Sequence, residues 1–306
     1  MIFNKFFILF KIGRKIGKSN IINIVSETHK IPVFIKLFFN LLAFSFSSSN
    51  NTKSKGKENL SESIQEMGTT FIKLGQFLAT RPDIIGEKLS KELESLQDKL
   101  PPFSKKEAEK IIIENLGQSN FDDIIDLSEP IAAASIAQVH KAKIKEDNII
   151  KNVAIKVLRP NIKKIFNDEI DAIMLLAYIV ESLISKTKRL KLIEVVFLFK
   201  EITNHEMDLR FEAAAANEYA ENTKNDLGFF VPKIYWNFTS ESVLTLDWVD
   251  GVSIREKDLL KEKNIETSKI ATNLIQHFLR HAVRDGFFHA DMHQGNIFIN
   301  ESSQIV

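Results

Sequence analysis

The sequence predicts an α+β fold, with a small β-rich lobe followed by a helical lobe and preceded by a helical extension. Apolar residues recur at helical spacing over residues 60–116, whereas short β-prone runs begin at Pro130. A further amphipathic segment then leads into a polar, histidine-rich loop near residue 290. With 306 residues the chain is long enough for two lobes that each bury a core.

The composition narrows the function classes. A hydrophobic content of 44% and a charged content of 26% are typical of a globular protein. The absence of cysteine excludes disulfides and thiolate metal sites, and favours a reducing, cytoplasmic compartment. A net charge of +1 does not favour nucleic acid as a partner.

Residues 1–57 form a basic, Phe-rich segment. Ten Lys or Arg stand against Glu27 alone, which gives this segment a net charge of +9 and the remainder −8. Such a segment indicates contact with an anionic membrane surface, although a buried docking helix explains it nearly as well. Its most apolar run, Ile31–Phe46, is shorter than the ~20 residues that a membrane span needs. We therefore expect peripheral attachment, with Ser45–Lys57 as a polar linker to the main fold.

The helical extension, residues 58–129, is predicted to begin with a helix over Leu60–Thr80. Lys73 and Gln76 are three residues apart in it and so share a face. Gly75 between them permits close approach by another segment. A solvated Lys and Gln beside a packing glycine is the simpler interpretation of this motif.

Two more helices are expected in the extension. The sequence Arg81-Pro82-Asp83 ends the first helix, and the second helix covers Ile84–Leu100. The third covers Ser104–Leu116, and Ser104 with Glu107 fits a capping box at its start.

The β-rich lobe, residues 130–250, contains an alanine-rich turn and a lysine within a strand. Lys156 lies in the apolar run Val153–Leu158, so it needs an anionic partner unless it is a snorkelling edge-strand lysine. A loop over phosphates followed by a strand lysine is the order found in kinases. The turn differs from a kinase glycine loop because alanine resists positive φ, so it should grip a nucleotide differently. Its residues are Ala132, Ala133, Ala134 and Ser135.

Long helices are predicted to interrupt this lobe over Ile162–Ser185 and, in two parts, over Leu192–Asn225. The second segment carries Glu206, Asp208 and Glu212. Asp208 and Glu212 are four residues apart and would share a helix face. These carboxylates are candidate partners for the two cations Lys73 and Lys156.

The remaining elements complete the two lobes. The sequence predicts two strands across a turn, a connection at Asp247–Gly251, a helix leading to the polar loop, and a terminal hairpin. In chain order these elements cover Val231–Asn237, Ser242–Trp248, Ile270–Asp285, Ile297–Ile299 and Ile305–Val306.

The polar loop at 284–299 has the layout of a kinase catalytic loop. Asp291 precedes Asn296 by five residues, just before a β-prone run. The Asp is placed to accept a proton from an attacking hydroxyl and the Asn to hold Mg²⁺. Two other interpretations remain open. In a strand, His289, Asp291 and His293 would face one side and could bind non-haem iron; otherwise the segment is a plain polar loop.

Taken together, the motifs are similar to those of the UbiB family of atypical kinase-like proteins, over a range from about Ser61 to the end. The matching segments are KLGQ at 73–76, AAASIAQVH at 132–140, VAIKVLRP at 153–160, the carboxylates at 206–214, LDWVDG at 246–251 and FFHADMHQGNIF at 287–298. The resemblance implies a protein-kinase-like fold with an N-terminal helical extension. It also implies binding of ADP or ATP with Mg²⁺, ATPase activity, and a role in ubiquinone biosynthesis at the membrane.

The resemblance also implies roles for single residues. Lys156 would bind the nucleotide phosphates and pair with Glu212, and the alanine-rich turn (Ala132, Ala133, Ala134, Ser135) would close over them. Asp291 would be the catalytic residue and Asn296 a Mg²⁺ ligand. Lys73 and Gln76 would face Glu206 and Asp208.

One departure from the family affects the expected activity. Residues 251–306 begin the helical lobe, but the sequence stops before the Asp-Phe-Gly-like motif that supplies the family's main metal ligand. We therefore expect a truncated or split product, inactive unless a separate chain supplies the missing part. A second departure, Gln294 where relatives often have Pro, should matter little.

Two alternative functions stay open. A small-molecule phosphotransferase has a similar Asp-to-Asn loop but gives no role to Lys73 and Gln76. A non-catalytic accessory protein that binds nucleotide or lipid is compatible with the missing motif. The favoured hypothesis is a cytoplasmic protein, peripheral to the inner membrane, that works with ubiquinone-biosynthesis proteins.

Overall fold

The computed structural model describes residues 2–18, 60–96, 100–183, 185–290, 292 and 294–306. The predicted linker Ser45–Lys57 lies outside these residues. The chain divides into two compact units. The helical unit consists of Met1–Pro101, Ala133–Ile136 and Arg159–His205, and the sheet unit of Pro102–Ala132, Ala137–Leu158 and Glu206–Val306.

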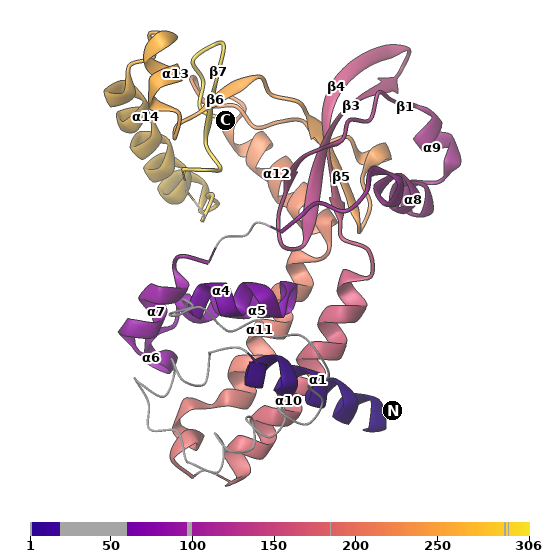
Figure 1. The fold of residues 1–306 in the computed structure, drawn as a ribbon. Coiled ribbons are helices and arrows are strands. Elements are labelled where there is room, and N and C mark those ends of the chain that lie inside the picture. The colour runs from indigo at the N-terminus through magenta and orange to yellow at the C-terminus, as the bar shows by residue number, and fades with distance from the viewer. Residues whose placement is uncertain (1, 19–59, 97–99, 184, 291, 293) are drawn as a thin grey trace. The chain divides into compact units, whose positions relative to one another are not determined.

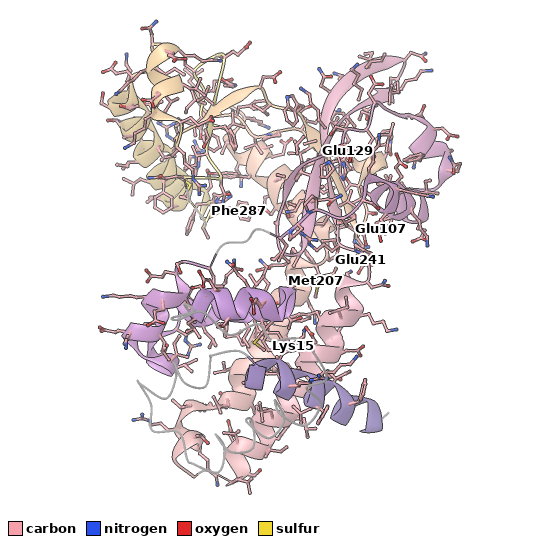
Figure 2. The ribbon with its side chains drawn as sticks, viewed as in Figure 1. Lys15, Glu107, Glu129, Met207, Glu241 and Phe287 are labelled. Atoms are coloured by element: carbon pink, nitrogen blue, oxygen red, sulfur yellow. The ribbon has the colours of Figure 1, made fainter. Side chains whose placement is uncertain are left out.

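The described residues of the helical unit lie mainly in α-helices (Figure 1). They are α1 (Ile2–Lys18), α4 (Leu60–Met67), α5 (Thr69–Ala79), α6 (Pro82–Ile85), α7 (Glu87–Leu93), α10 (Ile162–Leu183) and α11 (Leu192–Glu206), with a 3-10 helix at Ser185–Leu190. Apolar residues of α1, α4, α5 and α10 share one core around Met67 and Phe71. Lys15 of α1, labelled in Figure 2, donates to the carbonyl of Met67 at 2.9 Å and so ties α1 to this core.

The predicted helix over Leu60–Thr80 is wrong in one respect, because it is broken at Gly68. Gly68 has φ +101°, a conformation that favours glycine, and its carbonyl accepts from Phe71 and Ile72 to start α5. The predicted helix over Ile84–Leu100 is likewise shorter and divided, because Gly86, with φ +84°, separates α6 from α7. Apolar spacing continues across both breaks and therefore hides them.

Gly75 permits the close approach that its position in the motif suggested. A Cβ at this residue would collide with the side chain of Leu96 and would lie 3.4 Å from Ile64. The turn of α5 that carries Lys73 and Gln76 therefore packs tightly against α4 and against Leu96, which follows α7. The two long helices are also as expected, with α10 at Ile162–Leu183 and a second segment in two parts.

The sheet unit contains an antiparallel sheet in the order β1-β3-β4-β5, with β2 added on β3. Its bounds are β1 (Ile124–Ile125), β2 (Pro130–Ala133), β3 (Ala137–Glu146), β4 (Ile149–Leu158) and β5 (Val243–Asp247). Helices α8 (Lys105–Leu116) and α9 (Gln118–Asp122) lie beside it (Figure 1). Buried residues of the strands pack with Ile112 of α8 and with Tyr235 and Phe238.

The rest of the sheet unit is mainly helical. It contains α12 (Leu209–Thr223), a 3-10 helix (Trp236–Phe238), β6 (Gly251–Ser253), α13 (Lys257–Glu262), α14 (Thr267–Arg280), a π-helix (His281–Asp285) and β7 (Phe298–Asn300). Strands β6 and β7 pair antiparallel, with Val252 opposite Ile299, over a core that includes Leu260 and Ile305. This α+β arrangement confirms the predicted fold class.

Two predicted elements of this unit need correction. The strand expected at Val231–Asn237 is reduced to one bridge, Ile234 to Leu246, because Pro232 has no N–H and the chain turns into the 3-10 helix. The helix expected over Ile270–Asp285 starts at Thr267 and ends in the π-helix. The terminal hairpin is present as predicted, because Phe298 and Val306 exchange backbone hydrogen bonds at 3.0 and 2.8 Å, whereas the pairing of β7 with β6 was not predicted.

The capping box at the start of α8 is present as predicted, and it offers a test of local stability. Ser104 Oγ accepts from Glu107 N–H at 3.3 Å, and the Glu107 carboxylate accepts from Ser104 N–H. We predict that Ser104→Ala lowers the free energy of unfolding by about 1 kcal/mol, because one backbone donor loses its partner. Urea unfolding should show this loss, while Ser104→Asp, which still caps, should stay near wild type. Equal stability of the Ala and Asp variants would contradict the prediction.

Candidate functional site

Lys156 and Glu212 meet in the sheet unit. Lys156 lies on β4, opposite Val139 of β3 and Leu244 of β5. Its Nζ donates to both carboxylate oxygens of Glu212, at 2.9 and 2.7 Å. The structure therefore brings together the two residues that the sequence analysis expected to pair, although the phosphate-binding role of Lys156 stays a prediction.

The environment of this pair leaves it open to a ligand. The Lys156 side chain is 26% exposed and that of Glu212 49% exposed, so the pair contributes only about 1 kcal/mol or less to folding. A lysine ammonium has three N–H donors, and the bonds to Glu212 use two of them. The remaining donor has the chemistry to bind an anionic oxygen such as that of a phosphate.

The start of α12 sets the position of Glu212. Asp208 is the N-cap of this helix, and its carboxylate accepts from the backbone N–H of Arg210 at 3.1 Å and from the Arg210 guanidinium at 2.9 and 2.7 Å. The N–H of Leu209 donates to Glu241 O at 3.0 Å, beside β5. These contacts fix where α12 begins, and Glu212 follows within its first turn.

The expected common face of Asp208 and Glu212 does not form, because Asp208 is in an extended conformation outside the helix. The sequence Asp-Leu-Arg-Phe contained the signal, since Asp is a favoured N-cap. Lys73 and Gln76 belong to the helical unit and Glu206 and Asp208 to the sheet unit, so their expected pairing stays a prediction.

The alanine-rich turn combines a strand with a tight connection. Ala132 and Ala133 end β2, which pairs with β3, and Ala134 and Ser135 connect the two strands. None of these four residues has positive φ. This agrees with the expectation that alanine does not reproduce the backbone conformations of a glycine-rich loop.

The polar loop is described only in part. Asp291 and His293 lie outside the described residues. Residues 287–290, 292 and 294–296 are not in a strand, so this part of the loop does not provide the alternation that an iron site of His289, Asp291 and His293 requires. Met292 packs on the core beneath β6 and β7, and Asn296 is exposed just before β7.

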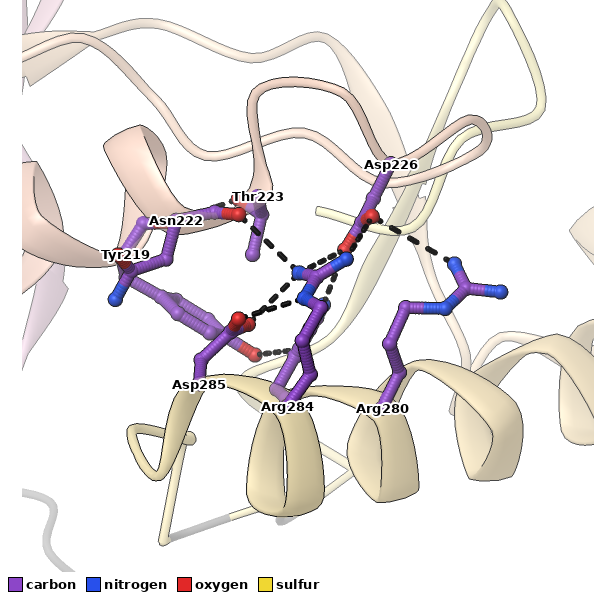
Figure 3. A network of polar contacts seen from close by, with 8 residues as sticks. Tyr219, Asn222, Thr223, Asp226, Arg280, Arg284 and Asp285 are labelled. Carbon is purple, nitrogen blue, oxygen red and sulfur yellow. Dashed lines mark hydrogen bonds and ion pairs between the residues drawn. The ribbon is translucent and has the colours of Figure 1, made fainter.

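An ion-pair network around the buried Asp226 holds the segment that leads into this loop, and sequence reasoning missed it (Figure 3). Both oxygens of Asp226 accept from the Arg284 guanidinium, at 2.8 and 2.9 Å, and Asp226 also accepts from His281 Nε2 at 2.9 Å. Arg284 binds Asp285 as well, at 2.6 and 2.7 Å. The bonds from Arg284, opposed by burial and assisted by His281, lower the pKa of Asp226 to about 2.

Tyr219 of α12 extends the network to the loop itself. Its hydroxyl lies 2.7 Å from His281 Nδ1, and it also forms a hydrogen bond with the backbone of His289. Burial raises the pKa of Tyr219 to about 12, so the phenol stays protonated at neutral pH. Through these contacts the last turns of α12 anchor the π-helix and the first residues of the polar loop.

The same region holds a group of potential metal ligands, Asp226, His277 and His281, whose ligand atoms lie within 4.8 Å of one another. Both Asp226 oxygens already accept hydrogen bonds from Arg284, and Arg280 lies 3.7 Å from the same carboxylate. A divalent cation would have to approach two guanidinium groups. The arrangement is therefore better explained as a structural anchor than as a metal centre.

Comparisons with known proteins identify the family and the fold of this chain. The sequence profile of the ABC1 atypical kinase-like domain matches residues 95–306. The chain belongs to the UbiB family of ABC1 atypical kinase-like proteins. It is 34% identical to "Probable protein kinase UbiB" of Marinobacter nauticus over 275 residues, 90% of this chain and 49% of the relative. The protein of the same description from Pseudomonas paraeruginosa is 31% identical over 294 residues, 95% of this chain and 54% of the relative.

The UbiB-like chain thus spans about half the length of the curated relatives it matches. A solved structure titled "The complex structure of Rv3197-erythromycin from Mycobacterium tuberculosis" aligns with a TM-score of 0.56 and 25% identity. That alignment covers 76% of this chain and 57% of the other. The family and the kinase-like fold are therefore shown.

The low pKa of Asp226 generates a pH prediction. An unfolded Asp titrates near 3.9, so the Asp226 contribution is fully present above about pH 5 and is lost as the pH falls through about 2. We predict that Asp226→Asn lowers the free energy of unfolding at neutral pH by ~2 kcal/mol. The free energy of unfolding of this variant should then fall less steeply than that of wild type between those pH values. Urea unfolding at several pH values measures it, with Asp258→Asn on exposed α13 as the control. Parallel pH profiles for wild type and Asp226→Asn would contradict the assignment.

Proposed function

We propose that this chain binds ADP or ATP with Mg²⁺ and acts as a UbiB-type atypical kinase or ATPase that supports ubiquinone biosynthesis at a membrane surface. The Lys156–Glu212 pair is the observation that carries the proposal. A partly exposed strand lysine held by a helix carboxylate suits the binding of nucleotide phosphates. The family of the chain supports the same chemistry.

The roles of the residues follow from their chemistry. Lys156 binds phosphate oxygens while Glu212 holds the ammonium in place, and the turn of Ala132, Ala133, Ala134 and Ser135 covers the phosphates. Asp291 receives the proton of the attacking hydroxyl or water. Each charged residue of the proposed site, Lys156, Glu212 and Asp291, thus has one role.

The exposed amide of Asn296 is a suitable oxygen donor for a hard cation such as Mg²⁺. Bound Mg²⁺ would neutralise charge on the phosphates. Mg²⁺ usually binds through carboxylates together with substrate phosphates, so Asn296 would hold it jointly with the nucleotide. We assign no further metal ligand among the described residues.

Contact with a membrane surface is part of this proposal. On α1, Phe7 is 57% and Phe10 39% exposed, and Lys11 lies over the Phe7 ring at 4.7 Å. Exposed aromatic rings beside lysines are typical of helices that lie at an anionic lipid surface. No helix among the described residues is long and apolar enough to cross a bilayer.

The proposal predicts that Lys156→Ala weakens binding of MgADP at least about tenfold, since the phosphates lose a charge-assisted bond. Isothermal titration calorimetry on the 306-residue chain measures it. Lys151→Ala, an exposed lysine on the same strand β4, is the matched control and should bind as wild type does. Absence of MgADP and MgATP binding by the wild-type chain, or equal affinities for both variants, would contradict the proposal.

A further inference from the structure

The alanine-rich turn groups with the helical unit, although it connects two strands of the sheet. Ala133–Ile136 belongs to the same compact unit as residues 1–101 and 159–205. Two side chains of that unit bind the turn's carbonyl groups, one from α5 and one from the residue directly after β4. The conformation of the turn therefore depends on side chains outside the sheet.

Arg159 is the first of these side chains. Its Nε and Nη2 donate to Ala134 O at 3.1 and 2.8 Å, and its backbone N–H donates to Ile136 O at 2.8 Å. The same guanidinium donates to Pro101 O at 3.0 Å and Leu100 O at 3.4 Å. One planar group thus connects the turn to residues 100 and 101 of the helical extension, which the single ammonium of a lysine could not do.

Thr69 is the second. It is the first residue of α5, the helix that carries Lys73 and Gln76, and its Oγ1 donates to Ser135 O at 3.2 Å. The position of the hydroxyl is fixed because α5 begins at the break made by Gly68. The turn and the family motif on α5 are therefore linked by a direct hydrogen bond.

These carbonyl bonds also determine where the N–H groups of the turn point. In a trans peptide the C=O of one residue and the N–H of the next point in opposite directions. Holding Ala134 O and Ser135 O therefore fixes the N–H groups of Ser135 and Ile136 toward the other side. Successive backbone N–H groups of this kind form sites for anions such as phosphate.

We propose that Arg159 and Thr69 are positioning residues that hold the alanine-rich turn in its phosphate-binding conformation and thereby couple nucleotide affinity to the helical extension. The inference rests on the proposed function. Its physical basis is preorganisation: a turn ordered before the ligand arrives does not lose conformational entropy on binding. Alanine already restricts the turn more than glycine would, and the two side chains restrict it further.

The test measures two properties of the full chain. We expect Thr69→Val and Arg159→Lys each to raise the Kd for MgADP by about threefold to tenfold, the loss expected for a hydrogen bond. Both variants should also speed amide hydrogen exchange over residues 132–136. Thr69→Ser keeps the hydroxyl donor, so its Kd for MgADP and its amide exchange over residues 132–136 should stay near those of wild type. Thr80→Val is the control, because it removes a hydroxyl bond to Phe77 O at the other end of α5.

The outcomes separate this inference from the proposed function. Wild-type Kd and wild-type exchange in both Thr69→Val and Arg159→Lys would overturn it, and faster exchange with an unchanged Kd would overturn the coupling to nucleotide. Equal losses in Thr69→Val and Thr80→Val would assign the effect to general helix stability and also overturn it. If wild type binds no MgADP, the proposed function fails, while hydrogen exchange still decides whether the two residues brace the turn.

Discussion

The ion pair between Lys156 and Glu212 is the contact on which the proposed phosphate-binding site depends. Lys156 lies in the middle of a sheet, flanked by Val139 and Leu244, and a carboxylate within reach holds its ammonium in place. The carboxylate arrives from a helix whose starting point is fixed by the Asp208 cap and by the bond from Leu209 to Glu241. Strand register and helix start must both be correct for the two charges to meet.

Helix α12 then connects this pair to the polar loop. It has 15 residues and so a length of about 22 Å. Glu212 lies in its first turn, whereas Tyr219 near its other end contacts His281, and Asp226 just beyond it binds Arg284. The two ends of one rigid helix thus position the strand lysine's partner and the entry to the predicted catalytic loop. A displacement of α12 would disturb both together.

Much of this could be predicted from local sequence, and the rest could not for identifiable reasons. Helical spacing of apolar residues predicted α8, α10 and the two-part helical segment that forms α11 and α12. Lys156 was identified because it is a single charge within an apolar run. The break at Gly68 was hidden because apolar spacing continues on both sides of it. The Asp226–Arg284 network joins residues 58 positions apart with no periodic signal. The support of the alanine turn by Arg159 and Thr69 is equally non-local, so only the fold brings these groups together.

The central claim is that Glu212 acts through Lys156, and a double-mutant cycle on MgADP affinity tests it most directly. Glu212→Gln should weaken binding in the wild-type background, because the ammonium loses the group that holds it. In a Lys156→Met background the same Glu212→Gln change should have no further effect on affinity. Equal losses from Glu212→Gln in both backgrounds would show that the two residues act independently, and would contradict the account.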